Sequence, residues 1–142
     1  MGGVWDIQPT GTTLAARAVA GALAHKLGTG AAAYRHATAA PVRRDVDTVP
    51  YEAYTKAHWV AIGGYSEALL TNEDYEFNYR TRLAGLRVVL DTGIRCQYFS
   101  RPTLRGLAVQ YFRWGWWKAQ MLRQYPESLK LRQAIPAVFV LA

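Results

Sequence analysis

Two adjacent carboxylates, Glu73 and Asp74, lie at the start of a helix that the sequence predicts from Thr71 to about Ala84, with Gly85 as its stop. Thr71 precedes Asp74 by three residues, which is the spacing of a capping box, and both acids lie at the positive end of the helix dipole. A structural role alone would account for this pattern. The same helix end would also hold Asp74 ionised and oriented, so that it can accept a proton from a hydroxyl as a general base. The two interpretations are compatible.

A second group of chemistry-bearing residues lies on a long helix predicted from Pro102-Thr103 to about Gln124. Gln110, Arg113 and Trp114 are spaced i, i+3 and i+4, so we expect them on one helix face, which Trp117 extends. An indole beside an amide and a guanidinium suits a sugar ring, which offers an apolar face and a rim of hydroxyls. The alternative is an amphipathic helix whose aromatic residues lie at a membrane boundary.

The same helix carries most of the positive charge. Residues 101–132 hold seven basic residues and one acidic residue, and therefore +6 of the formal net charge of +7. Three tryptophans interleave with these charges, a pattern that favours an anionic surface or a phosphorylated substrate. A neighbouring apolar stripe is expected to make the core contact of the helix: Leu104, Leu107, Ala108, Tyr111 and Leu122.

Composition and local patterns predict a single α/β domain that positions these two groups. The chain has 142 residues, of which 51% are hydrophobic, which excludes intrinsic disorder, and its one cysteine excludes an intrachain disulfide. No uninterrupted apolar run is long enough to span a membrane. We expect an irregular segment to about 11, then a helix that is capped by Thr12 or Thr13 and runs to about 27, and then a loop over 28–44. An extended segment over 46–54 should lead into a helix over 55–62 that ends at Gly63-Gly64. Two strands are expected over 86–90 and 94–98, joined by a turn at Asp91-Thr92-Gly93.

The sequence predicts no metal site. Asp45 and Asp47 form a DxD string, which can hold Mg²⁺ or Mn²⁺ against a diphosphate, but Arg43-Arg44 directly before them are placed to neutralise these acids. The histidines, His25, His36 and His58, have no metal-ligand spacing to one another or to Cys96. No phosphate-binding glycine motif occurs either.

The order of the motifs resembles a known family. The chain runs from Gly63-Gly64-Tyr65-Ser66-Glu67, through Thr71-Asn72-Glu73-Asp74 and the strand pair, to Gln110-Tyr111-Phe112-Arg113-Trp114. This order is similar to the C-terminal half of family 2 glycosyltransferases with the GT-A fold, and looks closest to the exopolysaccharide (succinoglycan-type) branch. It is similar also to cellulose and hyaluronan synthases. The resemblance covers roughly residues 47 to 136.

The resemblance implies residue roles and partners. Asp74 of the acidic pair Glu73-Asp74 would be the catalytic base of an inverting transfer, in which an acceptor hydroxyl attacks the anomeric carbon of a nucleotide sugar. Gln110, Arg113 and Trp114 match the family's QxxRW motif and would hold the acceptor and the donor diphosphate. Mg²⁺ or Mn²⁺ is implied for the complete enzyme, with its ligands outside this chain. The acceptor would be a glycan or a polyprenyl-linked sugar at the cytoplasmic face of a membrane. On this interpretation Asp74 and Trp114 face a common cleft.

The resemblance also sets expectations about the extent of the chain. The family's nucleotide-binding βαβ half, which ends in the metal-binding DxD, has no counterpart in this sequence. We therefore expect residues 1–136 to form a partial, acceptor-side domain, residues 137–142 to be the start of a truncated membrane helix or a C-terminal core element, and the chain alone to be inactive.

Two other functional classes are compatible with the charge pattern. A non-enzymatic membrane-surface module would use the basic aromatic helix to bind anionic lipid. A nucleic-acid binder is disfavoured, because the positive charge lies on a helix that also carries the apolar stripe.

Overall fold

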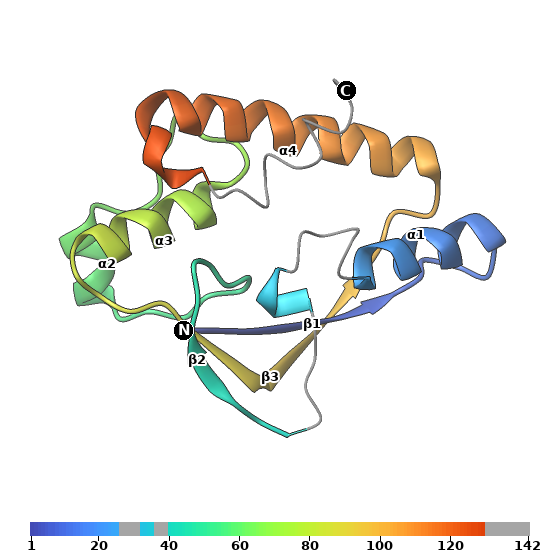
Figure 1. Cartoon of the computed structure of the whole chain (residues 1–142), viewed down its shortest axis with the longest axis horizontal. Helices are drawn as coiled ribbons and strands as arrows, with labels where there is room; N and C mark the ends of the chain where they lie inside the picture. Colours follow the sequence, from blue (N-terminus) through green and yellow to red (C-terminus); the bar gives the residue numbers. More distant parts are fainter. Residues whose placement is uncertain (26–31, 36–39, 130–142) are drawn as a thin grey trace.

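The computed structural model describes residues 1–25, 32–35 and 40–129. It confirms an α/β fold, in which a small sheet lies below the shorter helices and a long helix lies on top (Figure 1). The elements are, in chain order, β1 (Gly2–Gln8), α1 (Leu14–Ala24), the 3-10 turn η2 (Ala33–Arg35), β2 (Arg43–Asp45), α2 (Lys56–Ile62), α3 (Glu73–Leu83), β3 (Val89–Phe99), α4 (Leu104–Gln124) and the 3-10 turn η3 (Pro126–Ser128).

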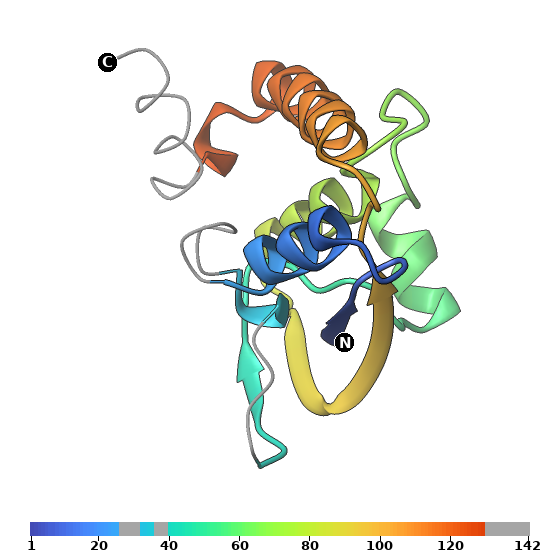
Figure 2. The same ribbon diagram turned by 90° about the vertical axis from the view of Figure 1, so that its right-hand side faces the viewer.

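The sheet has the order β1-β3-β2, with β1 parallel and β2 antiparallel to the central strand β3. The prediction of two strands joined by a turn at Asp91-Thr92-Gly93 is wrong, because β3 continues through these residues. Gly93 does not have the positive φ that a tight hairpin turn requires, and its amide donates instead to Asp91 Oδ1 at 2.9 Å. The strand therefore bends here rather than reversing (Figure 2), and pairs with β2 before the bend and mainly with β1 after it.

The first eleven residues are not irregular throughout, as the glycines and Pro9 led us to expect, because Gly2–Gln8 form strand β1. Gly2 is needed there for close approach of the chain. A Cβ on Gly2 would lie 2.6 Å from the Pro50 carbonyl oxygen, and one on Gly3 would overlap Ile94. The two glycines thus let β1 pack tightly against its neighbours, rather than loosening the segment.

Three of the predicted helix starts are confirmed. Thr13, Thr55 and Thr103 cap α1, α2 and α4, and each side-chain oxygen accepts a hydrogen bond from a backbone amide of the first turn. Helix α2 ends, as predicted, at Gly63, which has φ 87°. The segment 46–54, expected to be extended, forms no strand, and Tyr51 within it has a positive φ of 48°. Gly28 and residues 137–142 lie outside the described residues.

Two small apolar cores connect the elements. Val4, Val49, Val88 and Leu90 form a cluster against the sheet. A second cluster joins α3 to α4, and its buried members are Leu69, Tyr75, Tyr79 and Met121. Viewed from the side, α1 and α3 lie between the sheet and α4 (Figure 2). The second cluster therefore fixes the helix that starts at the acidic pair against the basic aromatic helix.

The buried face of α4 differs from the prediction. The expected core stripe lies largely in solvent: Leu104 is 65% exposed and Tyr111 is also exposed. Gln110, Trp114 and Trp117 are half-buried and Met121 is fully buried, so the inward face carries amide and aromatic groups. The inward face of α4 carries these groups because it packs mainly against tyrosine side chains of α3 and β3.

Candidate active site

The start of α3 is built differently from the predicted capping box. Thr71 does not cap the helix, because its hydroxyl donates to the Leu70 carbonyl oxygen at 2.8 Å. The N-cap is Asn72, which has φ 67° and makes no side-chain hydrogen bond to the helix amides. Asn and Asp tolerate this left-handed conformation better than most residues. Glu73 and Asp74 are the first two residues of the helix, as the sequence predicts within two positions.

The Asp74 carboxylate is held by its own helix end, and Oδ1 accepts a hydrogen bond from the Tyr75 amide at 2.7 Å. The residue is half-buried. Burial raises the pKa of Asp74, the backbone amides oppose the rise, and the neighbouring charge of Glu73 adds to it. The helix end thus orients the carboxylate, as expected, but burial outweighs the effect of the amides on its pKa. A raised pKa makes this carboxylate a stronger proton acceptor whenever it is ionised.

A second carboxylate, Glu52, lies close to Asp74 and was missed by sequence reasoning. The Tyr65 hydroxyl donates to Glu52 Oε1 at 3.1 Å. Burial raises the pKa of Glu52 to about 7, and the charge of Asp74 contributes to the rise. Glu52 stands alone in an irregular segment after Pro50, so no spacing in the sequence could have marked it. Two carboxyl groups of the site thus have raised pKa values, and the charge of Asp74 acts on Glu52.

An arginine on α3 fixes the loop that carries Tyr65. Arg80 donates from Nε to Glu76 Oε1 at 2.6 Å and from Nη2 to Glu76 Oε2 at 2.8 Å. The same guanidinium also donates to the carbonyl oxygens of Ile62 and Gly64. Glu76 is only 2% exposed. This clamp ties the Gly63-Gly64 turn to α3, and so sets the position of Tyr65 next to Glu52.

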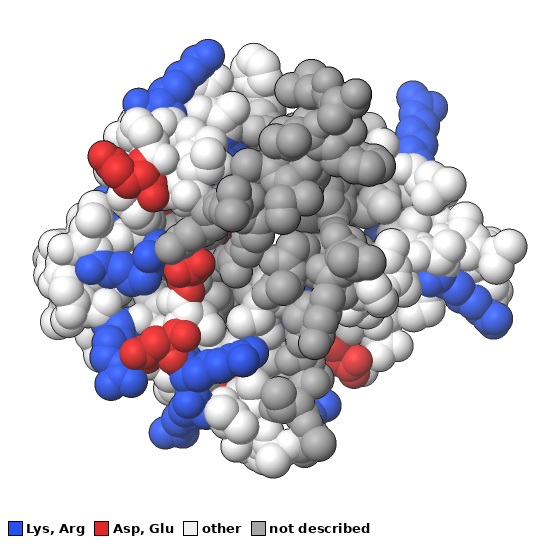
Figure 3. Space-filling model, viewed as in Figure 1, with Lys and Arg blue, Asp and Glu red and all other residues white. Residues whose placement is uncertain are grey.

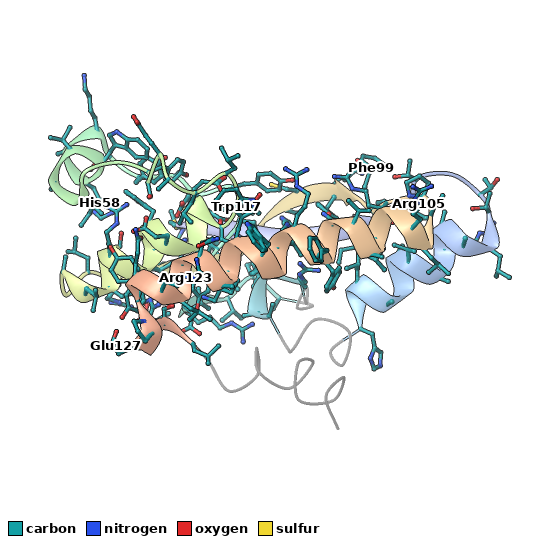
Figure 4. All side chains as sticks on the ribbon, turned by 90° about the horizontal axis from the view of Figure 1, so that it is seen from above. His58, Phe99, Arg105, Trp117, Arg123 and Glu127 are labelled. Atoms are coloured by element: carbon teal, nitrogen blue, oxygen red, sulfur yellow. The ribbon has the colours of Figure 1, made fainter. Side chains whose placement is uncertain are left out.

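The residues predicted to share one face of α4 are only partly brought together. Gln110 donates from Nε2 to the Tyr98 hydroxyl at 2.9 Å, and both Gln110 and Trp114 lie on the inward side. Arg113 is exposed, at the edge of that side. From above, α4 crosses the molecule, with Arg105 at the end near Phe99 and Arg123 at the end near His58 (Figure 4).

The acidic helix start and the aromatic helix meet directly. Asn72 donates from Nδ2 to the main-chain carbonyl oxygen of Trp114 at 3.1 Å. One turn further along both helices, the Lys118 ammonium lies 3.7 Å from the centre of the Tyr75 ring. Asp74 and Trp114 therefore lie on the same side of the molecule, on neighbouring helices.

A cleft lies where the Gly63-Gly64 turn, α3 and the C-terminal end of α4 meet. Its volume is about 520 Å³, and Tyr65, Glu76, Arg80 and Tyr125 help to line it. Neither Asp74 nor Trp114 is among its described lining residues. The structure thus places the two predicted residues on neighbouring helices, and a common cleft between them stays a prediction.

A second arginine that sequence reasoning missed contacts Trp114 from the other direction. Arg35 of η2 is 8% exposed, and its guanidinium carbon lies 5.5 Å from the Trp114 ring and 4.8 Å from the Trp5 ring. Arg35 lies in a stretch without periodicity, so no pattern of residues could have marked it.

The described residues offer no site for a divalent cation. They contain no group of three or more His, Cys, Asp or Glu side chains placed to hold a metal ion. In the DxD string, Asp45 pairs with Arg87 at 2.9 Å, and Asp47 lies 3.9 Å from Arg82. These carboxylates are neutralised by arginines, although by Arg82 and Arg87 rather than by Arg43-Arg44, the expected neighbours. Arg43 pairs instead with Asp91.

In the part of the chain that the structure describes, no helix is both long enough and apolar enough to cross a lipid bilayer. On the face shown in Figure 3, basic side chains project from both ends, and acidic side chains gather mainly over the α2–α3 end.

Comparison with known proteins gives one local similarity to a polysaccharide biosynthesis protein. No family model matches the chain, and no solved structure matches it. The relative is the succinoglycan biosynthesis protein ExoA of Rhizobium meliloti (strain 1021), which is 36% identical over 76 residues. The match covers 54% of this chain but only 23% of that protein. The chain therefore matches less than a quarter of the relative's length.

Proposed function

We propose that this chain is the acceptor-side part of an inverting glycosyltransferase that transfers a sugar from a nucleotide-sugar donor during exopolysaccharide synthesis. The observation that carries the proposal is the hydrogen bond from Asn72 to Trp114, which joins the helix that begins at Glu73-Asp74 to the helix that carries Gln110 and Trp114. The local similarity to a succinoglycan biosynthesis protein supports the same class. The GT-A fold of the complete domain is part of this proposal.

In the proposed mechanism Asp74 is the general base. Its carboxylate takes the proton from an acceptor hydroxyl, and the resulting oxygen nucleophile attacks the anomeric carbon while the bond to the nucleoside diphosphate breaks. A positioned base of this kind contributes about 10²–10⁴ in rate. The helix end holds the carboxylate in one orientation, and orientation of the acceptor supplies a further part of the rate. Glu73, the other acid of the pair, raises the pKa of Asp74 by its charge.

Trp114 and Gln110 are proposed to hold the acceptor. An indole face packs against the C–H face of a sugar, and an amide can donate to and accept from its hydroxyls. In the structure Gln110 Oε1 is buried without a hydrogen-bond partner, so one acceptor of this amide has no protein donor. Arg113, which is exposed, is proposed to contact the leaving diphosphate. Mg²⁺ or Mn²⁺ is part of the proposal for the complete enzyme, with its ligands outside this chain.

The test is sugar transfer from labelled nucleotide sugars to a glycan or polyprenyl-linked acceptor by the complete enzyme, with the anomeric configuration of the product determined by NMR. We expect a product of inverted configuration. Retention of configuration, or no transfer from any nucleotide sugar, would overturn the proposal. The 142-residue chain alone serves as the negative control, and measurable transfer by it would show that a separate donor-binding half is not needed.

A second candidate function is favoured by the outer face of α4. Phe112 is 73% exposed and Trp116 is 55% exposed, and they share this face with Val109 and with the basic residues Arg105 and Arg123. Helix α4 contains no acidic residue. Such a face suits the boundary of an anionic membrane, either in a non-enzymatic surface module or as the membrane-facing side of the proposed transferase at the cytoplasmic face.

A further inference from the structure

Several buried polar atoms without partners gather where β1, η2 and α4 meet. They are Nε and Nη1 of Arg35, the indole Nε1 of Trp5 and the amide Oε1 of Gln110. Buried polar groups in native proteins are almost always hydrogen-bonded, and each exception needs an explanation. Four such atoms in one place indicate a missing partner rather than separate defects.

The side chains concerned form one connected group, which we call the Arg35 cluster: Trp5, Tyr34, Arg35, Tyr98, Gln110 and Trp114. The Arg35 guanidinium lies 4.8 Å from the Trp5 ring centre, 5.6 Å from that of Tyr34 and 5.5 Å from that of Trp114. Trp5 stacks on Tyr98 with ring centres 4.2 Å apart, and the Tyr98 hydroxyl accepts from Gln110. The unpartnered donors and the unpartnered acceptor thus belong to side chains that touch one another.

The charge of Arg35 is not compensated by an acid. Among the described residues no carboxylate forms an ion pair with it. Burial raises the pKa of Tyr111, and both the charge of Arg35 and a hydrogen bond from its guanidinium oppose that rise, so the Tyr111 hydroxyl accepts from Arg35. Aromatic rings attract a cation, but they offer no acceptor to Nε and Nη1 of Arg35, which have no hydrogen-bond partner. Burial of a guanidinium with two unsatisfied nitrogens is unfavourable.

We infer that the Arg35 cluster binds an oxyanion, and that this anion is a diphosphate. A guanidinium presents N–H donors in a rigid fork that matches the oxygens of a phosphate group. The Trp5 indole adds a third donor, and the free oxygen of Gln110 can accept from a hydroxyl carried by the same ligand. The choice of diphosphate among oxyanions rests on the proposed function, in which both the nucleotide sugar and a polyprenyl-linked acceptor carry this group. Arg35 thereby takes the leaving-group or acceptor contact on the inner side of Trp114, opposite the exposed Arg113.

Binding is measured on the full 142-residue chain with inorganic pyrophosphate, so that the test does not depend on catalysis. Because Trp5 and Trp114 contact Arg35, we expect a saturable change in tryptophan fluorescence, and a rise in melting temperature that saturates with it. Potassium chloride at the same ionic strength should produce neither effect. Absence of a saturable response in the wild-type chain would overturn the inference, and the rings alone would then account for the burial of Arg35.

Three variants locate the site. Arg35→Gln should weaken pyrophosphate binding by about tenfold or more, because it removes the charge and the fork. Arg35→Lys keeps a positive charge among the aromatic rings and should bind pyrophosphate with intermediate affinity. It therefore separates the loss of the guanidinium from a loss of the fold. Arg17→Gln removes one exposed positive charge from α1 and should bind like the wild type. Wild-type affinity in a folded Arg35→Gln chain would contradict the assignment.

Two further ligands identify the source of the diphosphate. A nucleoside diphosphate that binds more tightly than pyrophosphate would assign the cluster to the donor, and a short-chain prenyl diphosphate that does so would assign it to a lipid-linked acceptor. The outcome is separate from that of the transfer assay. Pyrophosphate binding without sugar transfer by the complete enzyme would support the anion site and refute the proposed function. Sugar transfer without pyrophosphate binding would support the proposed function and refute the anion site.

Discussion

Asn72 donates a hydrogen bond from Nδ2 to the main-chain carbonyl oxygen of Trp114 at a distance of 3.1 Å, although the two residues lie 42 positions apart in the chain. Asn72 is also the N-cap of α3 and has a left-handed backbone conformation. The backbone of Asn72 therefore sets the direction in which α3 begins, and its side chain joins that helix start to α4.

Replacement of Asn72 should loosen this junction. Asn72→Ala removes the hydrogen bond and places a less tolerant residue at positive φ, so we expect a loss of about 1–3 kcal/mol in the free energy of unfolding. Asn72→Gly removes the same hydrogen bond but accepts the left-handed conformation, so its loss should be smaller. Urea denaturation of the three chains measures both effects. Equal stability of Asn72→Ala and the wild type would show that the contact does not hold the helices together.

The Arg80 clamp gives a second prediction. Arg80→Ala leaves the buried Glu76 carboxylate without its partner and frees the Gly63-Gly64 turn, so we expect a loss of about 3–5 kcal/mol in the free energy of unfolding. Arg80→Lys should recover only part of this loss, because an ammonium cannot reach both carboxylate oxygens and two carbonyl groups together.

The matched control for the clamp is Arg87→Ala, which breaks the exposed ion pair with Asp45. Its urea midpoint should stay close to that of the wild type, because exposed pairs contribute little to stability. A similar shift for Arg80→Ala and Arg87→Ala would mean that the buried clamp has no special role.

Glu52 predicts a dependence of stability on pH. Burial raises the pKa of its carboxyl group from 4.5 to about 7 in the folded chain, so the folded state binds the proton more tightly than the unfolded state. Stability from this group is therefore greatest below pH 4.5 and falls as the pH rises to about 7. Glu52→Gln should remove this fall and stabilise the chain at pH 8 relative to the wild type.

The measurement is the thermal midpoint across pH 4–8, with Glu67→Gln as the control in an exposed position near Tyr65. The control should keep the wild-type profile. If Glu52→Gln also keeps it, the carboxyl group of Glu52 does not titrate in this range.

The outer face of α4 predicts binding to anionic vesicles. Phe112→Ser and Trp116→Ser each remove an exposed aromatic group from this face, and each should weaken sedimentation with anionic liposomes by about tenfold or more. Added salt should weaken binding of the wild-type chain. Val60→Ser removes an exposed apolar group from α2 and should leave binding unchanged. Equal binding to neutral liposomes, or wild-type binding by both aromatic variants, would exclude this face as the lipid contact.

Local chemistry predicted much of the helical structure. Thr13, Thr55 and Thr103 cap their helices because a threonine before a helical stretch satisfies the first amides, whatever the rest of the fold does. The failures share a cause, which is that the deciding contact is distant in sequence. Gly2 and Gly3 suggested a loop until their close neighbours were known, and Asp91-Thr92-Gly93 suggested a hairpin because its pairing with β2 and β1 cannot be seen locally.

The same distinction applies to the candidate site. Glu73, Asp74, Gln110 and Trp114 were found because their spacing on helices is regular, and their catalytic and binding roles stay predictions. Glu52 and Arg35 stand alone in irregular segments, and only the fold brings them to Asp74 and Trp114. The inward face of α4 was misassigned because hydrophobicity placed the leucines in the core, whereas tyrosines on α3 and β3 accept the aromatic face.

The central claim is that the Asp74 carboxylate takes the proton from the acceptor hydroxyl, and the Asp74→Asn variant of the complete enzyme tests it most directly. The variant keeps the shape of the side chain, and circular dichroism should show an unchanged fold. We predict that sugar transfer falls by about 10²-fold or more, while Asp45→Asn, which alters the exposed pair with Arg87, transfers at the wild-type rate. Near-normal transfer by a folded Asp74→Asn enzyme would contradict the account.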